Sequence, residues 1–308
     1  MLRPRSFFFK LALLLLSTLD VADARRVQDE PFKLILTPIH TATFAFTILF
    51  GLIFLIMSLS NSGKLGNRHK VIPSGHRSTI YYVGPVYPIL ILLATLSLVV
   101  FYVLYAVTIV YTLNESVLNL RLLTYGFVAG RDFALHIAHW FIVCAMLGLL
   151  FVRERTCAGG QASRVCLRVV RSVLDGILLL ALLAVILALA GLEGSLQRNY
   201  RREALNWLAL QRAYIVLHGL LTVYVISSAF WTWRKLKEDS KYDLMMIGQV
   251  VKYISPFLFL LSAYEIAEHA LIYGSDILYS SAGALESLLL ARIVIVGIAN
   301  SAILWFAS

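Results

Sequence analysis

Ionisable side chains interrupt an apolar stretch at residues 131 to 140, which read RDFALHIAHW. Asp132, His136 and His139 are residue types that bind metal ions, carry protons or contact charged ligands. An α-helix turns by about 100° per residue, so these three residues fall within an arc of about 60° on one helix face. That face is the first candidate functional surface.

Further ionisable residues lie in three later apolar segments. The stretch YEIAEH, residues 264 to 269, places two glutamates and a histidine within an arc of about 100°. A charged side chain at the centre of a bilayer costs about 2.5–3.5 kcal/mol on insertion scales, so we expect these residues to face the interior of a helix bundle. The predicted ligand-binding residues of a shared polar pocket are Asp132, His136, His139, Arg212, His218, Glu265, Glu268, His269, Glu286 and Arg292.

Imidazole and carboxylate groups are also the ligand types of Zn and Fe. The H-x-x-H pair His136 and His139 puts two imidazoles on nearly one face, and His269 and Glu265 offer further ligands. The sequence has no H-E-x-x-H motif and no histidine cluster of the hydroxylase or desaturase type. A membrane metalloenzyme that uses His136 and His139 is therefore an alternative to a non-enzymatic function. No cofactor is predicted outright.

The composition indicates which solvent surrounds these residues. Of the 308 residues, 60% are hydrophobic and 14% are charged, whereas soluble chains carry about 25% charged residues. The mean hydropathy is +0.81. We therefore predict an all-α integral membrane protein whose main partner is the lipid bilayer. The net charge of +10 does not indicate nucleic-acid binding, because the Lys and Arg residues lie in short loops between apolar runs.

Seven apolar runs are long enough to cross a bilayer as helices, which rise 1.5 Å per residue. Continuous runs exclude a β-barrel, whose strands alternate over about 10 residues. Pro256, inside the sixth run, predicts a kink. The sequence thus predicts one seven-helix transmembrane domain over residues 25–308. The predicted spans are residues 36–60, 83–111, 127–152, 172–192, 205–233, 244–273 and 278–306.

The first 24 residues have the pattern of a secretory signal peptide. They combine a basic start, a short apolar stretch and the A-x-A sequence Ala22-Asp23-Ala24. We predict cleavage after residue 24, with an uncleaved anchoring helix as the alternative. A signal peptide implies the secretory pathway, and with it the plasma membrane or an endomembrane.

The loop charges predict an orientation. Three alternate loops carry more Lys and Arg than the segments on the opposite side, so the positive-inside rule places the N-terminus outside and the C-terminus in the cytosol. The N-x-S sequon at Asn114 then lies outside and is a predicted glycosylation site. The basic loops are residues 61–82, 153–171 and 234–243.

A receptor- or sensor-like function fits this topology best. A small ligand would enter an outward-facing polar pocket, and a cytosolic partner would contact the basic inner loops. The motifs of rhodopsin-like receptors are absent, since the third span ends in FVRERT and the seventh contains GIANSAIL. The carboxylates of the pocket also suit a proton-coupled transporter, although seven spans do not divide into two equal repeats.

One local resemblance concerns the stretch HIAHW, residues 136–140. It resembles the third-helix R-Y-x-D-W stretch of microbial rhodopsins, which implies a seven-helix bundle that binds retinal through a lysine in the last helix. The last span here carries Arg292 and no lysine. Retinal is therefore not expected.

Overall fold

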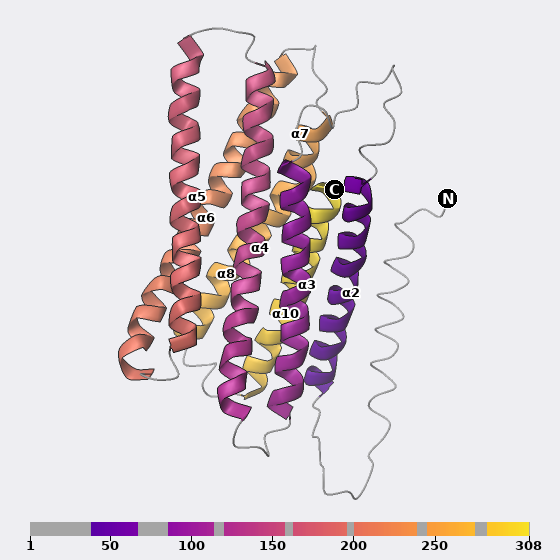
Figure 1. Ribbon diagram of the computed structural model, residues 1–308, viewed down its shortest axis with the longest axis vertical. Coiled ribbons are helices and arrows are strands. Elements are labelled where there is room, and N and C mark those ends of the chain that lie inside the picture. Colours follow the sequence, from indigo (N-terminus) through magenta and orange to yellow (C-terminus); the bar gives the residue numbers. More distant parts are fainter. Residues whose placement is uncertain are drawn as a thin grey trace, which may run out of the picture.

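The computed structural model describes seven segments of the chain. In these segments all regular structure is helical (Figure 1), which confirms the predicted all-α fold. The predicted signal peptide and Asn114 lie outside the described residues. The described segments are residues 38–66, 86–113, 120–157, 163–195, 200–238, 245–274 and 282–307.

Seven helices of the described segments are long and apolar enough to cross a membrane, as the sequence predicts. The sixth span combines three consecutive elements, α7, η3 and α8. The predicted orientation of the termini stays a prediction. The elements are α2 (Pro38–Gly66), α3 (Val86–Leu113), α4 (Leu120–Cys157), α5 (Ser163–Ser195), α6 (Tyr200–Glu238), α7 (Met245–Gln249), η3 (Val250–Ile254), α8 (Ser255–Gly274) and α10 (Ala282–Ala307).

Several helices are longer than their apolar spans. Helix α4 runs from Leu120 to Cys157, whereas its apolar span covers Gly126–Phe151, close to the predicted 127–152. Its additional turns include arginine and glutamate, which are good helix formers. Hydropathy therefore predicts the membrane-crossing part of this helix, while helix propensity extends the helix beyond it.

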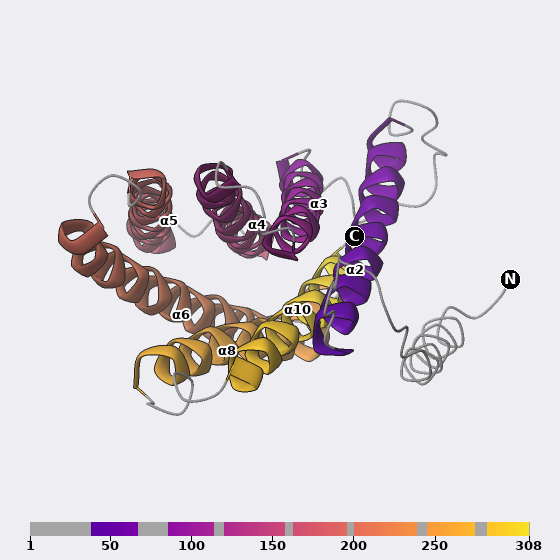
Figure 2. The ribbon, with the colours of Figure 1, turned by 90° about the horizontal axis from the view of Figure 1, so that it is seen from below.

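The helices form a closed ring in chain order. Each helix contacts the next from α2 to α6, α6 contacts α8, α8 contacts α10, and α10 returns to α2. In Figure 2, α5, α4 and α3 form one row and α6, α8 and α10 cross beneath them in a second row. An additional contact joins α4 to α6. This contact brings the polar face of α4 against a helix that is distant in sequence.

Helix α4 carries the most buried of the seven apolar spans. In its apolar window 61% of the residues are buried, compared with 17% in α5. The outer surface carries exposed large apolar side chains such as Leu52, Leu180 and Val223. Apolar groups on the outside and polar groups inside are the arrangement that a hydrocarbon solvent favours.

Close packing joins α10 to α2 at Gly297. A Cβ atom at this position would lie 2.5–2.6 Å from ring atoms of Phe50. The Phe50 ring is also 5.9 Å from that of Tyr102 on α3, centroid to centroid. The absence of a side chain at Gly297 therefore allows α10 to approach the aromatic cluster between α2 and α3, as small residues do in membrane helix packing.

The sixth span contains a π-helical turn, Val250–Ile254, directly before Pro256. The carbonyl of Val250 accepts hydrogen bonds from both the backbone N–H and the hydroxyl of Ser255, the latter at 2.9 Å. A proline lacks the N–H that would continue an α-helical ladder, and π-turns are one way in which a helix absorbs that loss. The irregularity that Pro256 predicts is thus a change of helix type.

Candidate functional site

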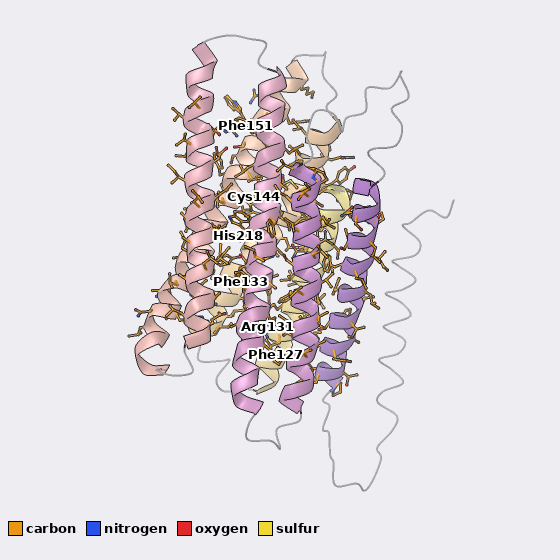
Figure 3. The ribbon with its side chains drawn as sticks, in the orientation of Figure 1. Phe127, Arg131, Phe133, Cys144, Phe151 and His218 are labelled. Carbon is orange, nitrogen blue, oxygen red and sulfur yellow. The ribbon has the colours of Figure 1, made fainter. Side chains whose placement is uncertain are left out.

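The polar face of α4 meets α6, α8 and α10 inside the bundle. Asp132, His136 and His139 come from α4, and their partners come from the three helices that lie much later in the chain. In Figure 3, the label of His218 on α6 lies at a height between those of Phe133 and Cys144 on α4. The centre of the site is therefore near mid-height of the bundle.

Glu265 on α8 contacts two histidines from two other helices. Its Oε1 lies 3.2 Å from Nδ1 of His139, and its Oε2 lies 2.7 Å from Nδ1 of His218. Both histidine side chains are 1% exposed and Glu265 is 13% exposed. Because a carboxylate only accepts hydrogen bonds, each Nδ1 carries the proton when these contacts are hydrogen bonds. This group, His139–Glu265–His218, is called the histidine–glutamate group below.

Two residues that the sequence analysis did not select complete this group. The Oη of Tyr214 lies 3.2 Å from Nδ1 of His139, and Nδ2 of Asn300 lies 3.4 Å from the Nε2 of the same ring. The ring of Tyr214 is stacked on that of His218, with centroids 5.6 Å apart. Tyr214 and His218 are four residues apart on α6, so helical spacing from His218 is the signal that points to Tyr214. Asn300 is one of four polar residues in the apolar last span, with Ser287, Arg292 and Ser301.

A second group consists of alternating opposite charges. Arg131 contacts both carboxylate oxygens of Asp132 at 2.9 and 3.0 Å. Arg292 on α10 reaches Asp132 at 3.5 Å and Glu268 on α8 at 3.7 Å. The guanidinium of Arg131 also lies 4.8 Å from the ring centroid of Tyr105 on α3. These four charged residues, Arg131, Asp132, Glu268 and Arg292, are called the ionic network below.

The ionic network is nearer one end of the bundle than the histidine–glutamate group. Asp132 and Arg292 come soon after the starts of their apolar spans at Gly126 and Ser287, and Glu268 precedes the end of its span at Ile272. All three lie within about two helical turns of those ends. These groups therefore converge in one half of the bundle. Whether that half faces outward stays a prediction.

The other predicted site residues have different places. The ring of His136 packs on that of Tyr214, with centroids 4.1 Å apart. The side chain of Arg212 is exposed on α6, and neither group described above includes it. His269 is half-buried on α8. Glu286 belongs to α10, but its side chain lies outside the description.

The histidine–glutamate group has the ligand types and spacing of a metal site. Its three donor atoms, one from each residue, lie within 4.8 Å of one another. His136, which the sequence analysis paired with His139, does not belong to this group. Although the spacing of His136 and His139 puts them on nearly one face of α4, the group takes its second imidazole from α6.

Comparisons with known proteins add no family assignment. No family model, no curated protein and no solved structure matches this chain. Functional conclusions therefore depend on the chemistry of the site.

Proposed function

We propose that this multi-pass membrane protein has a receptor- or sensor-like function, in which a small charged ligand binds at the ionic network. The observation that carries the proposal is the junction of three helices at Arg292. This guanidinium connects α10 to Asp132 on α4 and to Glu268 on α8 at 3.5 and 3.7 Å. Both distances exceed the 2.7–2.9 Å of a strong charge-assisted hydrogen bond. A ligand that contacts either carboxylate or the guanidinium would change how the helices are held together.

Access to the network supports this proposal. The side chains of Arg131, Asp132 and Arg292 are 11%, 14% and 18% exposed, so they are not sealed inside the bundle. Charged groups in a membrane protein face the bundle interior or a water-filled space, because contact with hydrocarbon is costly. The exposed parts of these side chains are therefore expected to contact water, as ligand entry requires.

The π-helical turn supports a response to the ligand. Glu268 and Glu265 belong to α8, which continues directly from Val250–Ile254 in the same span. Short π-helical segments are frequent at functional sites, and a local change of helix type alters the rotation and tilt of the adjoining helix. Movement of α8 at Glu268 would thus be transmitted to the opposite half of the membrane at Lys252. A second arrangement of this segment would supply the bistable element that a sensor needs.

A fluorescence experiment tests the proposed coupling. Lys252 is exposed in the π-helical turn, so Lys252→Cys carries an environment-sensitive label in a background in which Cys144, Cys157 and Cys166 are replaced by alanine. We expect Glu268→Gln and Arg292→Met to shift the emission of the label, because each removes the charged contact between α8 and α10. Arg212→Gln, which changes an exposed charge outside the network, is the control.

Identical spectra in all variants of correctly folded protein would contradict the sensor proposal. The network would then serve only to hold the helices together. If the spectra shift, a panel of small amines, carboxylates and zwitterions is tested for changes in emission and in thermal stability. An effect that disappears in Glu268→Gln identifies the ligand class.

A proton-coupled transporter is the second candidate, because Glu265 lies between two imidazoles. Carboxylates and histidines in contact are the groups that relay protons in membrane proteins. Proteoliposomes that contain a pH-sensitive dye distinguish this candidate from a sensor. Proton flux that is lost in Glu265→Gln supports transport, and the absence of flux in wild-type protein opposes it.

A further inference from the structure

We propose that His139, His218 and Glu265 bind one divalent transition-metal ion, with Zn²⁺ as the expected species. The site joins α4, α6 and α8 at the centre of the bundle. This inference goes beyond the proposed sensor function and does not depend on it. It also differs from the metal site that the sequence suggests, because His136 is replaced by His218 as the second imidazole.

The ligand types support this assignment. Two imidazoles and one carboxylate form the protein part of many catalytic zinc sites, which keep a fourth position for water or substrate. The same ligand set occurs in non-haem iron sites with open positions. Calcium and magnesium are less suitable because they prefer oxygen ligands. The chemistry of the donors therefore selects a first-row transition metal.

The distances need only small changes. Four ligands at 2.0–2.1 Å from a tetrahedral zinc ion lie about 3.3 Å from one another. Nδ1 of His139 is 3.2 Å from Glu265, and Nδ1 of His218 is 2.7 Å from Glu265. All three donors lie within 4.8 Å of one another. Changes in side-chain conformation, without movement of the helices, are therefore enough to bring the three donors to the spacing that an ion requires.

The charge of Glu265 gives a reason for a cation at this position. Asp132 and Glu268 both pair with guanidinium groups, whereas Glu265 pairs with two imidazoles. A carboxylate in a low-dielectric interior is costly unless a positive charge compensates it. A divalent ion supplies that charge and leaves both imidazoles neutral. Each Nδ1 proton would move to Nε2, so metal binding changes the tautomers without releasing a proton.

Asn300 is suited to support the metal-bound tautomer. Its side chain is buried, its Nδ2 faces Nε2 of His139 at 3.4 Å, and its Oδ1 has no hydrogen-bond partner within the described residues. When Nδ1 of His139 binds a metal, Nε2–H becomes a donor and needs an acceptor. A half-turn of the amide presents Oδ1 to that N–H, and it breaks the 3.0 Å hydrogen bond that Nδ2 now donates to the carbonyl of Val296. Asn300 is thus assigned as the residue that orients His139.

Metal analysis of the purified full-length protein tests the site. The protein is prepared in mild detergent without chelators, its metal content is measured by mass spectrometry, and the metal-depleted form is titrated with Zn²⁺ and Co²⁺. We expect about one ion per chain and the visible absorption of four-coordinate Co²⁺. Loss of a residue that only orients a metal ligand costs about 10–100-fold in affinity. Loss of a ligand itself, in His139→Ala or His218→Ala, is therefore expected to weaken binding at least about 100-fold.

The matched control is His136→Ala, which removes a histidine from the same face of α4 without removing a ligand. It is expected to keep the wild-type affinity. Asn300→Ala keeps all three ligands and is expected to weaken binding by about 10-fold. Glu265→Gln preserves side-chain size in case the alanine variants unfold, and it is expected to bind poorly. Size-exclusion profiles and helical circular dichroism establish that each variant is folded.

Three outcomes would overturn the assignment. The first is that folded wild-type protein binds neither Zn²⁺ nor Co²⁺ at micromolar concentration. The second is that His136→Ala loses as much metal affinity as the ligand variants. The third is that folded His139→Ala and His218→Ala bind the metal as tightly as the wild-type protein. None of these outcomes concerns the label at residue 252, so metal binding and sensor coupling are tested separately. Metal binding without coupling would favour the metalloenzyme alternative, with His218 in place of His136.

Discussion

At the scale of single residues, the partners of each carboxylate decide its chemistry. Glu265 contacts imidazoles, which exchange protons and bind transition metals. Asp132 contacts guanidinium groups, which stay protonated and bind no metal. Two carboxylates in the same bundle thus have different functions, one as a metal ligand in our proposal and one as the anchor of the ionic network.

The anchor function of Asp132 predicts a large loss of stability in Asp132→Ala. This change leaves both Arg131 and Arg292 without their shared carboxylate, and removal of one partner from a buried charge pair costs about 3–5 kcal/mol. Glu268→Gln removes only the 3.7 Å contact to Arg292 and is expected to cost about 1 kcal/mol or less. Reversible unfolding in mixed detergent micelles measures both values. Equal losses in the two variants would show that Asp132 is not the anchor.

At the scale of elements, helix packing depends on local exceptions to regular structure. The π-helical turn before Pro256 and the contact of Gly297 with Phe50 are two such exceptions. The first lies in the span that carries Glu265 and Glu268. The second brings α10, which carries Arg292 and Asn300, close to α2. Both therefore help to set the positions of groups in the candidate site.

The contact at Gly297 predicts that Gly297→Ala is destabilising. The added methyl group would overlap the Phe50 ring, and overpacking of this kind typically costs about 1–3 kcal/mol. Gly219→Ala on α6 is the control, because a Cβ there has nothing within 4 Å. Thermal unfolding in detergent measures both variants. Phe50→Leu should recover part of the loss, and the absence of any loss in Gly297→Ala would contradict the close packing.

At the scale of the whole molecule, the seven spans of the described residues form a ring whose apolar exterior suits a bilayer and whose interior contains the histidine–glutamate group and the ionic network. The ring order is that of the chain, so consecutive helices are neighbours. The α4–α6 contact crosses this order and closes the site. Because its groups come from four helices, the site requires the folded bundle and has no counterpart in an isolated segment.

The predicted orientation has consequences for the whole chain. A fluorescent protein fused after Ser308 is expected to resist protease added to intact cells, because the basic loops favour a cytosolic C-terminus. A glycan on Asn114, detected as a mobility shift that Asn114→Gln removes, would place that residue on the opposite side. If the protease digests the fusion in sealed cells, the C-terminus is outside and the predicted orientation is wrong. A ligand would then reach the ionic network from the opposite side of the membrane.

The sequence by itself determined the helical class, the number of membrane spans and the polar face of α4. These properties depend on composition, run length and the 3.6-residue period, which are local. It also identified His139, His218 and Glu265 as candidates, since ionisable residues in apolar runs are conspicuous. Arg131 lies in the stretch RDFALHIAHW, but its pairing with the adjacent Asp132 depends on side-chain conformation.

Only the tertiary structure decided which of these residues meet. It joined His139 to His218 and Glu265, and it placed His136 against Tyr214. It also brought Asn300 to His139 and left Arg212 exposed. The physical reason is that contacts between helices depend on crossing geometry, rotation and depth. These properties result from packing of the whole bundle, including the π-turn and Gly297, whereas the sequence pattern specifies only the face on which each residue lies.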